Sequence, residues 1–204
     1  MPRTGARGGP QTRARILEAA HWMFLERGYD AVTVADVARE AGVSSVTVFN
    51  HFPRKEDLFL DRTDDAVELL RSSVRDRAPG VDALTSLRET AFRLFDERQP
   101  LSGVDERSLP FFRTVAGSPA LVARAREIAA ELQRILADEL EQDPRFDGDR
   151  TLLAAFFMAG YSAVMVETAR RVIAGESPSD LVDDHRERLE RLFGALRSGV
   201  APQA

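Results

Sequence analysis

Side chains with the chemistry to contact nucleic acids gather between residues 33 and 58 of this 204-residue sequence. Hydroxyl and amide groups can hydrogen-bond to phosphates and base edges, and a small apolar group can contact the methyl of thymine. The residues expected to face outward at the centre of the segment are Ser45, Val46, Thr47 and Asn50. Their sizes and chemistry suit the major groove of DNA.

Two short helices are needed to present these side chains, and the spacing predicts them over residues 33–42 and 44–52. Gly42 can adopt the positive φ that a tight turn between them requires. With a preceding helix over residues 12–28, they predict a helix-turn-helix. The valines spaced to form its small core are Val34, Val37, Val43 and Val48.

The rest of the sequence shows helical spacing of apolar residues and no persistent strand alternation. We expect an all-α fold of about nine helices, three short ones followed by roughly six longer ones. The predicted parts are a flexible basic arm (1–11), a helix-turn-helix domain (12–54) and a larger helical domain (55–204). The longer helices are expected over 55–77, 81–98, 105–116, 119–141, 149–174 and 178–197.

Charge is distributed unevenly along the chain. Residues 1–55 hold eight basic and five acidic side chains, a net charge of +3, and the whole chain carries −5, so the remainder carries −8. A short basic N-terminal segment in an otherwise acidic chain favours site-specific DNA binding over general coating of nucleic acids. The N-terminal arginines could enter a minor groove or merely add unspecific charge. They are Arg3, Arg7, Arg13 and Arg15.

Other classes of protein are disfavoured. The absence of cysteine excludes disulfides and a cysteine nucleophile. We expect no enzyme and no catalytic residue, because no nucleophile elbow, phosphate loop or HExxH motif is present. The histidines lie far apart, so no metal and no cofactor is expected. The run around His185 is interpreted as a solvated helix face with the pairs Asp184–Arg188 and Glu187–Arg191.

We expect a cytoplasmic protein with no membrane contact. The N-terminus shows no secretory signal, and the longest apolar run, Leu152–Val166, falls short of the ~20 residues that a membrane span needs. That run is interpreted as a buried helix, apolar all round and covered on both sides.

Over residues 12–60 the sequence resembles the tetracycline-repressor (TetR) family of transcriptional regulators. The resemblance rests on a glycine-aromatic pair after the first helix and on two motifs, Thr-x-x-x-Val-Ala-x-x-Ala-Gly-Val-Ser and Thr-x-aromatic-x-His-Phe-x-x-Lys-x-x-Leu. The residues that carry it are Gly28-Tyr29, Thr33, Val37-Ala38, Ala41–Ser44, Thr47, Phe49, His51-Phe52, Lys55 and Leu58.

The resemblance implies roles in operator binding. Thr33, Thr47 and Lys55 would contact phosphates, and Asn50 could pair with adenine. This chain departs from the family pattern at Val46 (usually Gly), Phe49 (usually Tyr) and Arg54 (usually Ser). The implied DNA-binding set is Thr33, Ser44, Ser45, Val46, Thr47, Phe49, Asn50, His51, Arg54 and Lys55.

The resemblance also implies that residues 55–204 bind an effector and form a homodimer on a palindromic operator. The chain would then be a ligand-responsive regulator, most simply a repressor. The alternative is a constitutive DNA-binding adaptor controlled by a protein partner. A small, largely apolar or aromatic effector would contact a set of residues that could equally be ordinary core. They are Phe92, Phe95, Phe111, Phe112, Phe156, Phe157, Tyr161 and Met165.

Dimerisation would join the last two helices of each subunit into a four-helix bundle. Small side chains in the helix predicted over residues 149–174 would allow the two subunits to approach closely, and apolar residues of 178–197 would complete the interface. The alternative is a monomer in which the helix over 149–174 is simply central. The candidate interface residues are Ala155, Ala159, Gly160, Ala163, Leu189, Leu192, Phe193 and Leu196.

Overall fold

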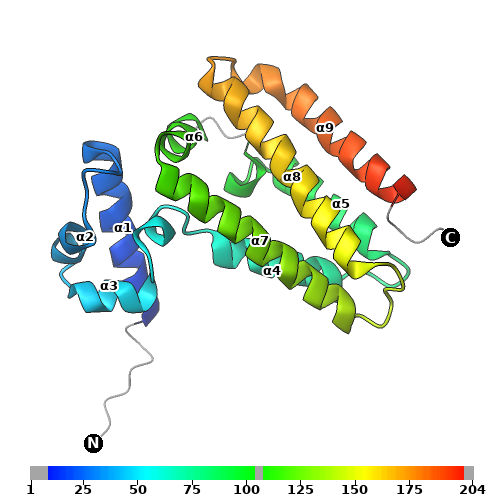
Figure 1. The fold of residues 1–204 in the computed structure, drawn as a ribbon, viewed down its shortest axis with the longest axis horizontal. Coiled ribbons are helices and arrows are strands. Elements are labelled where there is room, and N and C mark those ends of the chain that lie inside the picture. The colour runs from blue at the N-terminus through cyan, green and yellow to red at the C-terminus, as the bar shows by residue number, and fades with distance from the viewer. Residues whose placement is uncertain (1–8, 104–107, 200–204) are drawn as a thin grey trace, which may run out of the picture. The chain divides into compact units, whose positions relative to one another are not determined.

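The computed structural model describes residues 9–103 and 108–199. Over these residues the chain forms nine α-helices, two short 3-10 helices (η1 and η2) and no strand (Figure 1). The predicted all-α architecture, a helix-turn-helix followed by a helical domain, is confirmed. The chain divides into two compact units: residues 1–61 with 116–124 form the first unit, and residues 62–115 with 125–204 form the second.

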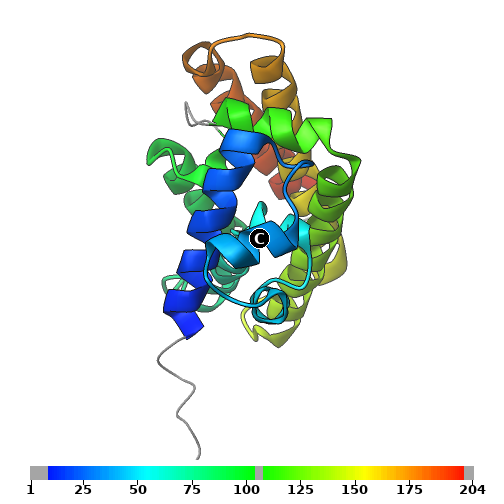
Figure 2. The ribbon, with the colours of Figure 1, turned by 90° about the vertical axis from the view of Figure 1, so that its left-hand side faces the viewer.

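The first unit contains three α-helices arranged as a helix-turn-helix (Figure 2). Residues 9–11, which we expected in the arm, are already helical. Pro10 is tolerated in this first turn because no backbone N–H is needed there. The elements of the unit are α1 (Gly9–Arg27), α2 (Val34–Glu40), α3 (Ser45–His51) and η1 (Lys55–Leu58), together with the start of α7 (Pro119–Gln142).

Two glycines close the turns of the first unit. Gly28 ends α1 with φ of 83° and Gly42 joins α2 to α3 with φ of 66°, both in the left-handed region that favours glycine. Val37 and Val48, two of the predicted core valines, are completely buried. The other buried apolar residues of these helices include Ile16, Ala20, Met23, Phe24 and Leu58.

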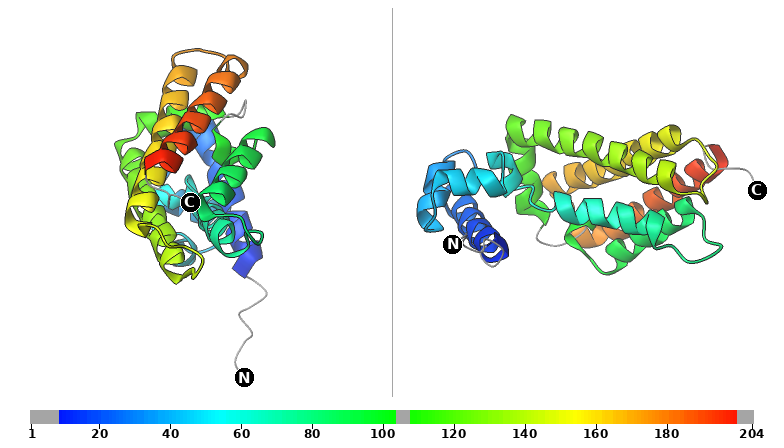
Figure 3. Two further views of the ribbon diagram at one scale, coloured as in Figure 1. Left: turned by 90° about the vertical axis from the view of Figure 1, so that its right-hand side faces the viewer. Right: turned by 90° about the horizontal axis from the view of Figure 1, so that it is seen from below.

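The second unit is a bundle in which α4 lies beside α5 and α8 lies beside α9 (Figure 3). Its elements are α4 (Thr63–Arg75), α5 (Ala83–Asp96), η2 (Pro100–Ser102), α6 (Ser108–Gly117), α7 from residue 125, α8 (Arg150–Ile173) and α9 (Pro178–Gly199). Its core is made by α4, α5, α7, α8 and α9. The largest buried side chains there include Leu87, Phe92, Phe95, Leu136, Leu153, Phe157, Leu189 and Phe193.

The single helix predicted over residues 55–77 was wrong. The chain forms η1, then a turn, and α4 begins only at Thr63. The physical reason is that the two segments serve different cores. Leu58 is completely buried in the first unit, whereas Val74 belongs to the core of the second.

Helix α8 is less covered within its own chain than the sequence suggested. One side, including Leu153, Ala154 and Phe157, is buried in the core, but Phe156 and Val166 are exposed. Among the described helices, α8 alone has the length and composition to cross a membrane, a property that the core helix of a soluble protein can share.

Candidate nucleic-acid interface and effector cavity

Helix α3 presents one face to solvent and buries the other. Its exposed large side chains are Val46 and Phe49, with 69% and 49% of their surface accessible, and Asn50 lies beside them. Val48 is completely buried on the opposite side. The exposed positions are spaced at i, i+3 and i+4, so they share one side of the helix.

The start of α3 is organised by hydroxyl groups. Ser44 is the N-cap, and its Oγ accepts a hydrogen bond from the Thr47 backbone N–H at 3.1 Å. The two side-chain oxygens lie 2.9 Å apart and share a further hydrogen bond. Ser45 is half-buried beside them. Two hydroxyls of the predicted DNA-binding set therefore also hold the helix terminus together.

Thr33 closes a capping box at the start of α2. Its Oγ1 donates to Asp36 at 2.6 Å and accepts from the Asp36 backbone N–H at 3.2 Å. The side-chain and backbone hydrogen bonds from Thr33 lower the pKa of Asp36 to about 2. The hydroxyl proton that was expected to reach a phosphate is thus already donated to Asp36.

Two arginines counted with the N-terminal arm brace the helix-turn-helix instead. The guanidinium of Arg13 lies 4.8 Å from the ring centroid of Phe52, the C-cap of α3. Arg15 donates to the backbone carbonyl of Ala41, at the C-cap of α2. The expectation that these two side chains enter a minor groove is therefore not supported by their contacts. Arg3 and Arg7 lie outside the described residues.

Lys55 also folds back onto its own unit. Its Nζ donates to the backbone carbonyl of Tyr29 at 2.6 Å and lies 4.1 Å from the centroid of the Tyr29 ring. Partial burial lowers the pKa of Lys55, although the nearby carboxylates of Asp30 and Glu56 act in the opposite direction. Sequence reasoning missed this contact because it joins residues 26 positions apart.

Two further residues of the predicted DNA-binding set, His51 and Arg54, lie at the carboxyl end of α3 and just after it. His51 is half-buried, and its ring centroid lies 6.5 Å from that of Phe52. Arg54 is exposed, and its backbone N–H donates to the Asp57 carboxylate at 3.2 Å. Asp57 in turn accepts from Arg124, at the start of α7, at 2.8 Å.

The aromatic residues predicted to bind an effector mostly fill the interior of the second unit. Phe92, Phe95, Phe112 and Phe157 are buried, whereas Phe111 and Phe156 are exposed. Tyr161 and Met165 are partly buried, and the Tyr161 hydroxyl donates to the carbonyl of Leu101 at 3.2 Å. None of the eight predicted residues lines the cavity between α4, α5 and η2.

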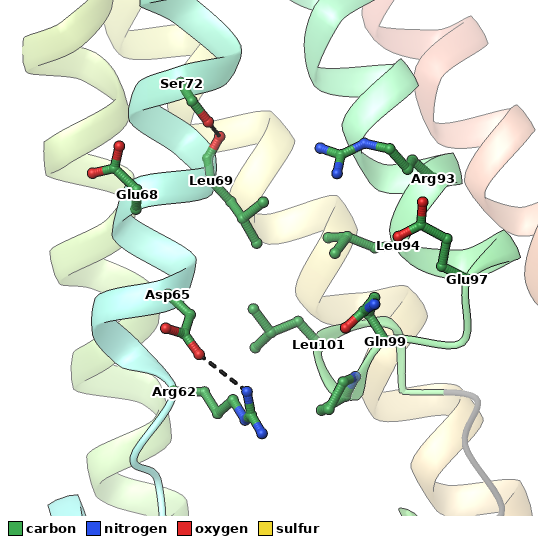
Figure 4. A pocket seen from close by; sticks show the side chains of 11 residues that line it. Arg62, Asp65, Glu68, Leu69, Ser72, Arg93, Leu94, Glu97, Gln99 and Leu101 are labelled. Atoms are coloured by element: carbon green, nitrogen blue, oxygen red, sulfur yellow. Dashed lines mark hydrogen bonds and ion pairs between the residues drawn. The ribbon is translucent and has the colours of Figure 1, made fainter.

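A cavity of about 350 Å³ opens between α4, α5 and η2 (Figure 4). Its apolar surface comes from Leu69, Leu94 and Leu101, and Pro100 lies beside them. Charged side chains surround this apolar floor. They are Arg62 and Asp65, which form an ion pair at 3.2 Å, together with Glu68, Arg93 and Glu97.

An apolar stripe runs along the uncovered side of α8. It is formed by exposed residues at intervals of four and three positions, which is the spacing of one helix face. Two of them, Ala159 and Ala163, belong to the predicted dimer interface. The stripe consists of Leu152, Phe156, Ala159, Ala163 and Val166.

The other predicted interface residues are mostly used within the chain. Leu189, Phe193 and Leu196 are buried in the core of the second unit. Gly160 allows α9 to approach α8, because a Cβ added there would lie 2.2 Å from Leu192 Cδ1. Ala155 is half-buried on α8.

His185 was wrongly placed on a solvated face. The predicted pairs Asp184–Arg188 and Glu187–Arg191 are present at 2.7 and 2.6 Å, but His185 between them is buried. Its Nδ1 lies 2.8 Å from Thr168 Oγ1 and its ring stacks on Phe95. The missed signal is the apolar spacing of α9, in which position 185 follows Leu181 by one helical turn.

Comparison with known proteins places these features in context. A family model described as "Bacterial regulatory proteins, tetR family" matches residues 16–61. The transcriptional activator FasR of Mycolicibacterium smegmatis is 26% identical over 171 residues, covering 83% of this chain and 76% of FasR. The transcriptional regulator TcmR of Streptomyces glaucescens is 31% identical over 150 residues, covering 67% of this chain and 66% of TcmR.

A solved structure extends the similarity over nearly the whole fold. FadR of Thermus thermophilus, described as a TetR-family transcriptional repressor in complex with lauroyl-CoA, superposes with a TM-score of 0.57 at 25% identity. The match covers 94% of this chain and 96% of that one. The similarity therefore includes the helical second unit as well as the helix-turn-helix.

Proposed function

This chain belongs to the tetR family of bacterial regulatory proteins, and from that premise we propose that it regulates transcription by binding operator DNA through α3. Its relatives by sequence and fold are transcription regulators and not enzymes. The observation that carries the proposal is the exposed face of α3. Val46 and Phe49 offer apolar contacts to thymine methyls and sugars, and Asn50 can hydrogen-bond to adenine.

Residues around α3 would hold the DNA backbone. The proposed contacts are the polar groups at the start of α3 and those at and beyond its end, where phosphate contacts fix the register of the helix in the groove. They are Ser44, Ser45, Thr47, His51 and Arg54.

A homodimer would present two copies of α3 to a palindromic operator. The proposed interface is the apolar stripe of α8, because large exposed side chains such as Phe156 and Val166 are costly in water and self-complementary across a two-fold axis. The buried residues Leu189, Phe193 and Leu196 would support this surface from within the subunit rather than contact the partner.

The cavity between α4, α5 and η2 is the proposed effector site. Its volume of about 350 Å³ lies at the lower end of small-molecule pockets. Because leucines form its floor and charges its rim, we propose an amphipathic effector in place of the largely apolar one suggested by the aromatic residues. Support comes from the FadR relative, whose ligand lauroyl-CoA joins an apolar chain to a charged group.

Effector binding would control the affinity for DNA. Helix α4 provides one wall of the cavity. It begins at Thr63, two residues after Asp61, which is the last residue of the first unit's N-terminal segment. A ligand that favours one position of α4 would shift the population of DNA-binding conformations. The simplest outcome is a cytoplasmic repressor that leaves its operator when the effector binds.

Fluorescence anisotropy tests this function. Full-length protein is titrated onto DNA from immediately upstream of its own gene and onto shuffled DNA of the same composition. We expect preference for the upstream DNA, lost in Asn50→Ala, and release of the complex by amphiphiles such as lauroyl-CoA. Equal affinity for both DNAs would refute operator binding. Specific binding that no small amphiphile reverses would instead favour an adaptor controlled by a protein partner.

A further inference from the structure

We propose that Lys55 is a positioning residue, which fixes the carboxyl end of α3 from inside the first unit and does not contact DNA phosphates. The inference rests on the proposed operator-binding function. It differs from the phosphate contact that the family resemblance implies for this lysine.

The ammonium of Lys55 is held by a carbonyl and two aromatic rings. Nζ donates to the Tyr29 carbonyl at 2.6 Å, and it lies 4.1 Å from the Tyr29 ring centroid and 5.9 Å from that of Phe24. A cation above a ring face is attracted by the electrons of the ring, and the attraction increases as water is removed. A phosphate would have to draw the side chain out of these contacts.

The contact joins the segments that leave α1 and α3. Tyr29 directly follows Gly28, at the end of α1, and its buried ring packs on Phe24 and Phe59 with centroids 5.1 and 5.8 Å away. Lys55 opens η1, four residues after the last residue of α3. The hydrogen bond therefore connects the segment that follows α3 to the turn that follows α1.

A second brace acts on the same end of α3. Phe52, the C-cap of α3, is buried, and the guanidinium of Arg13 on α1 lies 4.8 Å from its ring centroid. The carboxyl end of α3 is thus held to α1 and its following turn at two places. Displacement of α3 by even 1 Å would misalign base contacts, because hydrogen bonding to base edges depends on fixed geometry.

The choice of residue is consistent with this role. Lys55 is the only lysine in a sequence with 27 arginines. An ammonium is a compact cation with three rotatable donors, whereas a guanidinium is a wider planar group suited to paired contacts with phosphate. If this position served phosphate binding, arginine would be favoured there. It is instead the one position of the sequence that has lysine.

A single lysine also gives a direct spectroscopic test. In full-length protein labelled with carbon-13 and nitrogen-15 lysine, Lys55 provides the only lysine side-chain signals. We expect its Cε protons to be shifted upfield by the Tyr29 ring, and we expect the Nζ and Cε signals to stay in place when saturating upstream DNA is added. Unshifted Cε protons in the free protein, or a large change on DNA binding, would overturn the proposal.

The salt dependence of binding provides the second test. Loss of one phosphate contact makes the slope of log affinity against log salt shallower by about 0.9. We expect Lys55→Met to weaken operator binding about 10-fold, as loss of a charge-assisted hydrogen bond would, with the slope unchanged and the preference over shuffled DNA reduced. Lys55→Met with a slope shallower by about 0.9 and an unchanged preference would contradict the proposal.

Arg54→Gln is the matched control, because it removes the same charge from an exposed neighbouring residue proposed to contact phosphate. It should make the slope shallower. Lys55→Gln replaces the Met variant if circular dichroism shows that the latter is unfolded. If the wild-type protein fails to prefer upstream DNA, the proposed function is wrong, and the spectrum of the free protein still decides whether Lys55 occupies its aromatic cage.

Discussion

Glu139 on α7 accepts two hydrogen bonds from Arg75 on α4, at 2.6 and 2.7 Å, while its carboxylate is almost completely buried. Arg71, one turn earlier on α4, lies 3.3 Å from the same carboxylate. The carboxyl end of α4 is therefore clamped to α7, whereas the wall of the proposed effector cavity runs from the amino end of α4 as far as Ser72. This arrangement allows an effector to act on one end of α4 while the other end stays fixed.

Glu139→Gln should destabilise the protein by about 2 kcal/mol. The amide keeps the shape of the side chain but loses the charge of the two hydrogen bonds from Arg75 and the ion pair with Arg71. The expected loss of unfolding free energy is smaller than for a fully buried ion pair, because both arginines are partly exposed. Thermal unfolding should show a melting temperature several degrees lower.

Glu141→Gln on the same helix is the control. Glu141 pairs with Arg150 at 2.9 Å, but both side chains are about half exposed, so the loss should be at most about 1 kcal/mol. Equal melting temperatures for the two variants would show that the clamp on α4 contributes nothing.

His185 should make the protein less stable in mild acid. Burial lowers its pKa from 6.5 to about 4, so between these values the unfolded chain binds a proton that the folded chain does not. Stability from the neutral histidine is complete above pH 6.5 and is lost as the pH falls toward 4, with a slope of at most about 1.4 kcal/mol per pH unit.

The measurement is urea unfolding of wild type and His185→Gln at several pH values from 7 down to about 4, with the slope difference as the readout. The variant should lose less stability than the wild type over this window. Parallel wild-type and His185→Gln curves would contradict burial of the neutral ring.

Val166→Glu should dissociate the proposed dimer. The substitution places a charge on the apolar stripe of α8, which the partner subunit would cover in the proposed dimer, and a desolvated charge without a partner is strongly unfavourable. Sedimentation should give twice the 22.6 kDa of one chain for the wild type and a single chain mass for the variant. Leu25→Glu, an equally exposed position on α1, should stay dimeric; dissociation of both would point to unfolding rather than an interface.

The local structure of the helix-turn-helix could be predicted from sequence because its signals are short-range. Thr33 and Asp36 form a capping pair three residues apart at the start of the helix predicted from residue 33, and Gly42 makes the expected turn. The pairs of α9, at i and i+4, were found for the same reason. Periodicity and capping act within one or two helical turns, so a single sequence contains them.

The contacts that long side chains make could not be predicted from the sequence. Arg15 and Lys55 each reach a carbonyl 26 residues away, and nothing in their own neighbourhoods distinguishes such a brace from a solvated cation. Aromatic residues presented a similar problem, since Phe157 in the core and Phe156 on the surface are adjacent in one apolar helix. Their roles depend on which side of α8 the rest of the bundle covers.

Selection from random DNA tests the central claim, which is recognition of a palindromic operator by two copies of α3. Wild-type full-length protein is incubated with a randomised duplex library, and bound sequences are recovered over several rounds. We expect enrichment of an inverted repeat, with half-sites separated by about one helical turn of DNA or a multiple of it, and no enrichment by Asn50→Ala. A library that stays random, or a site without two-fold symmetry, would contradict it.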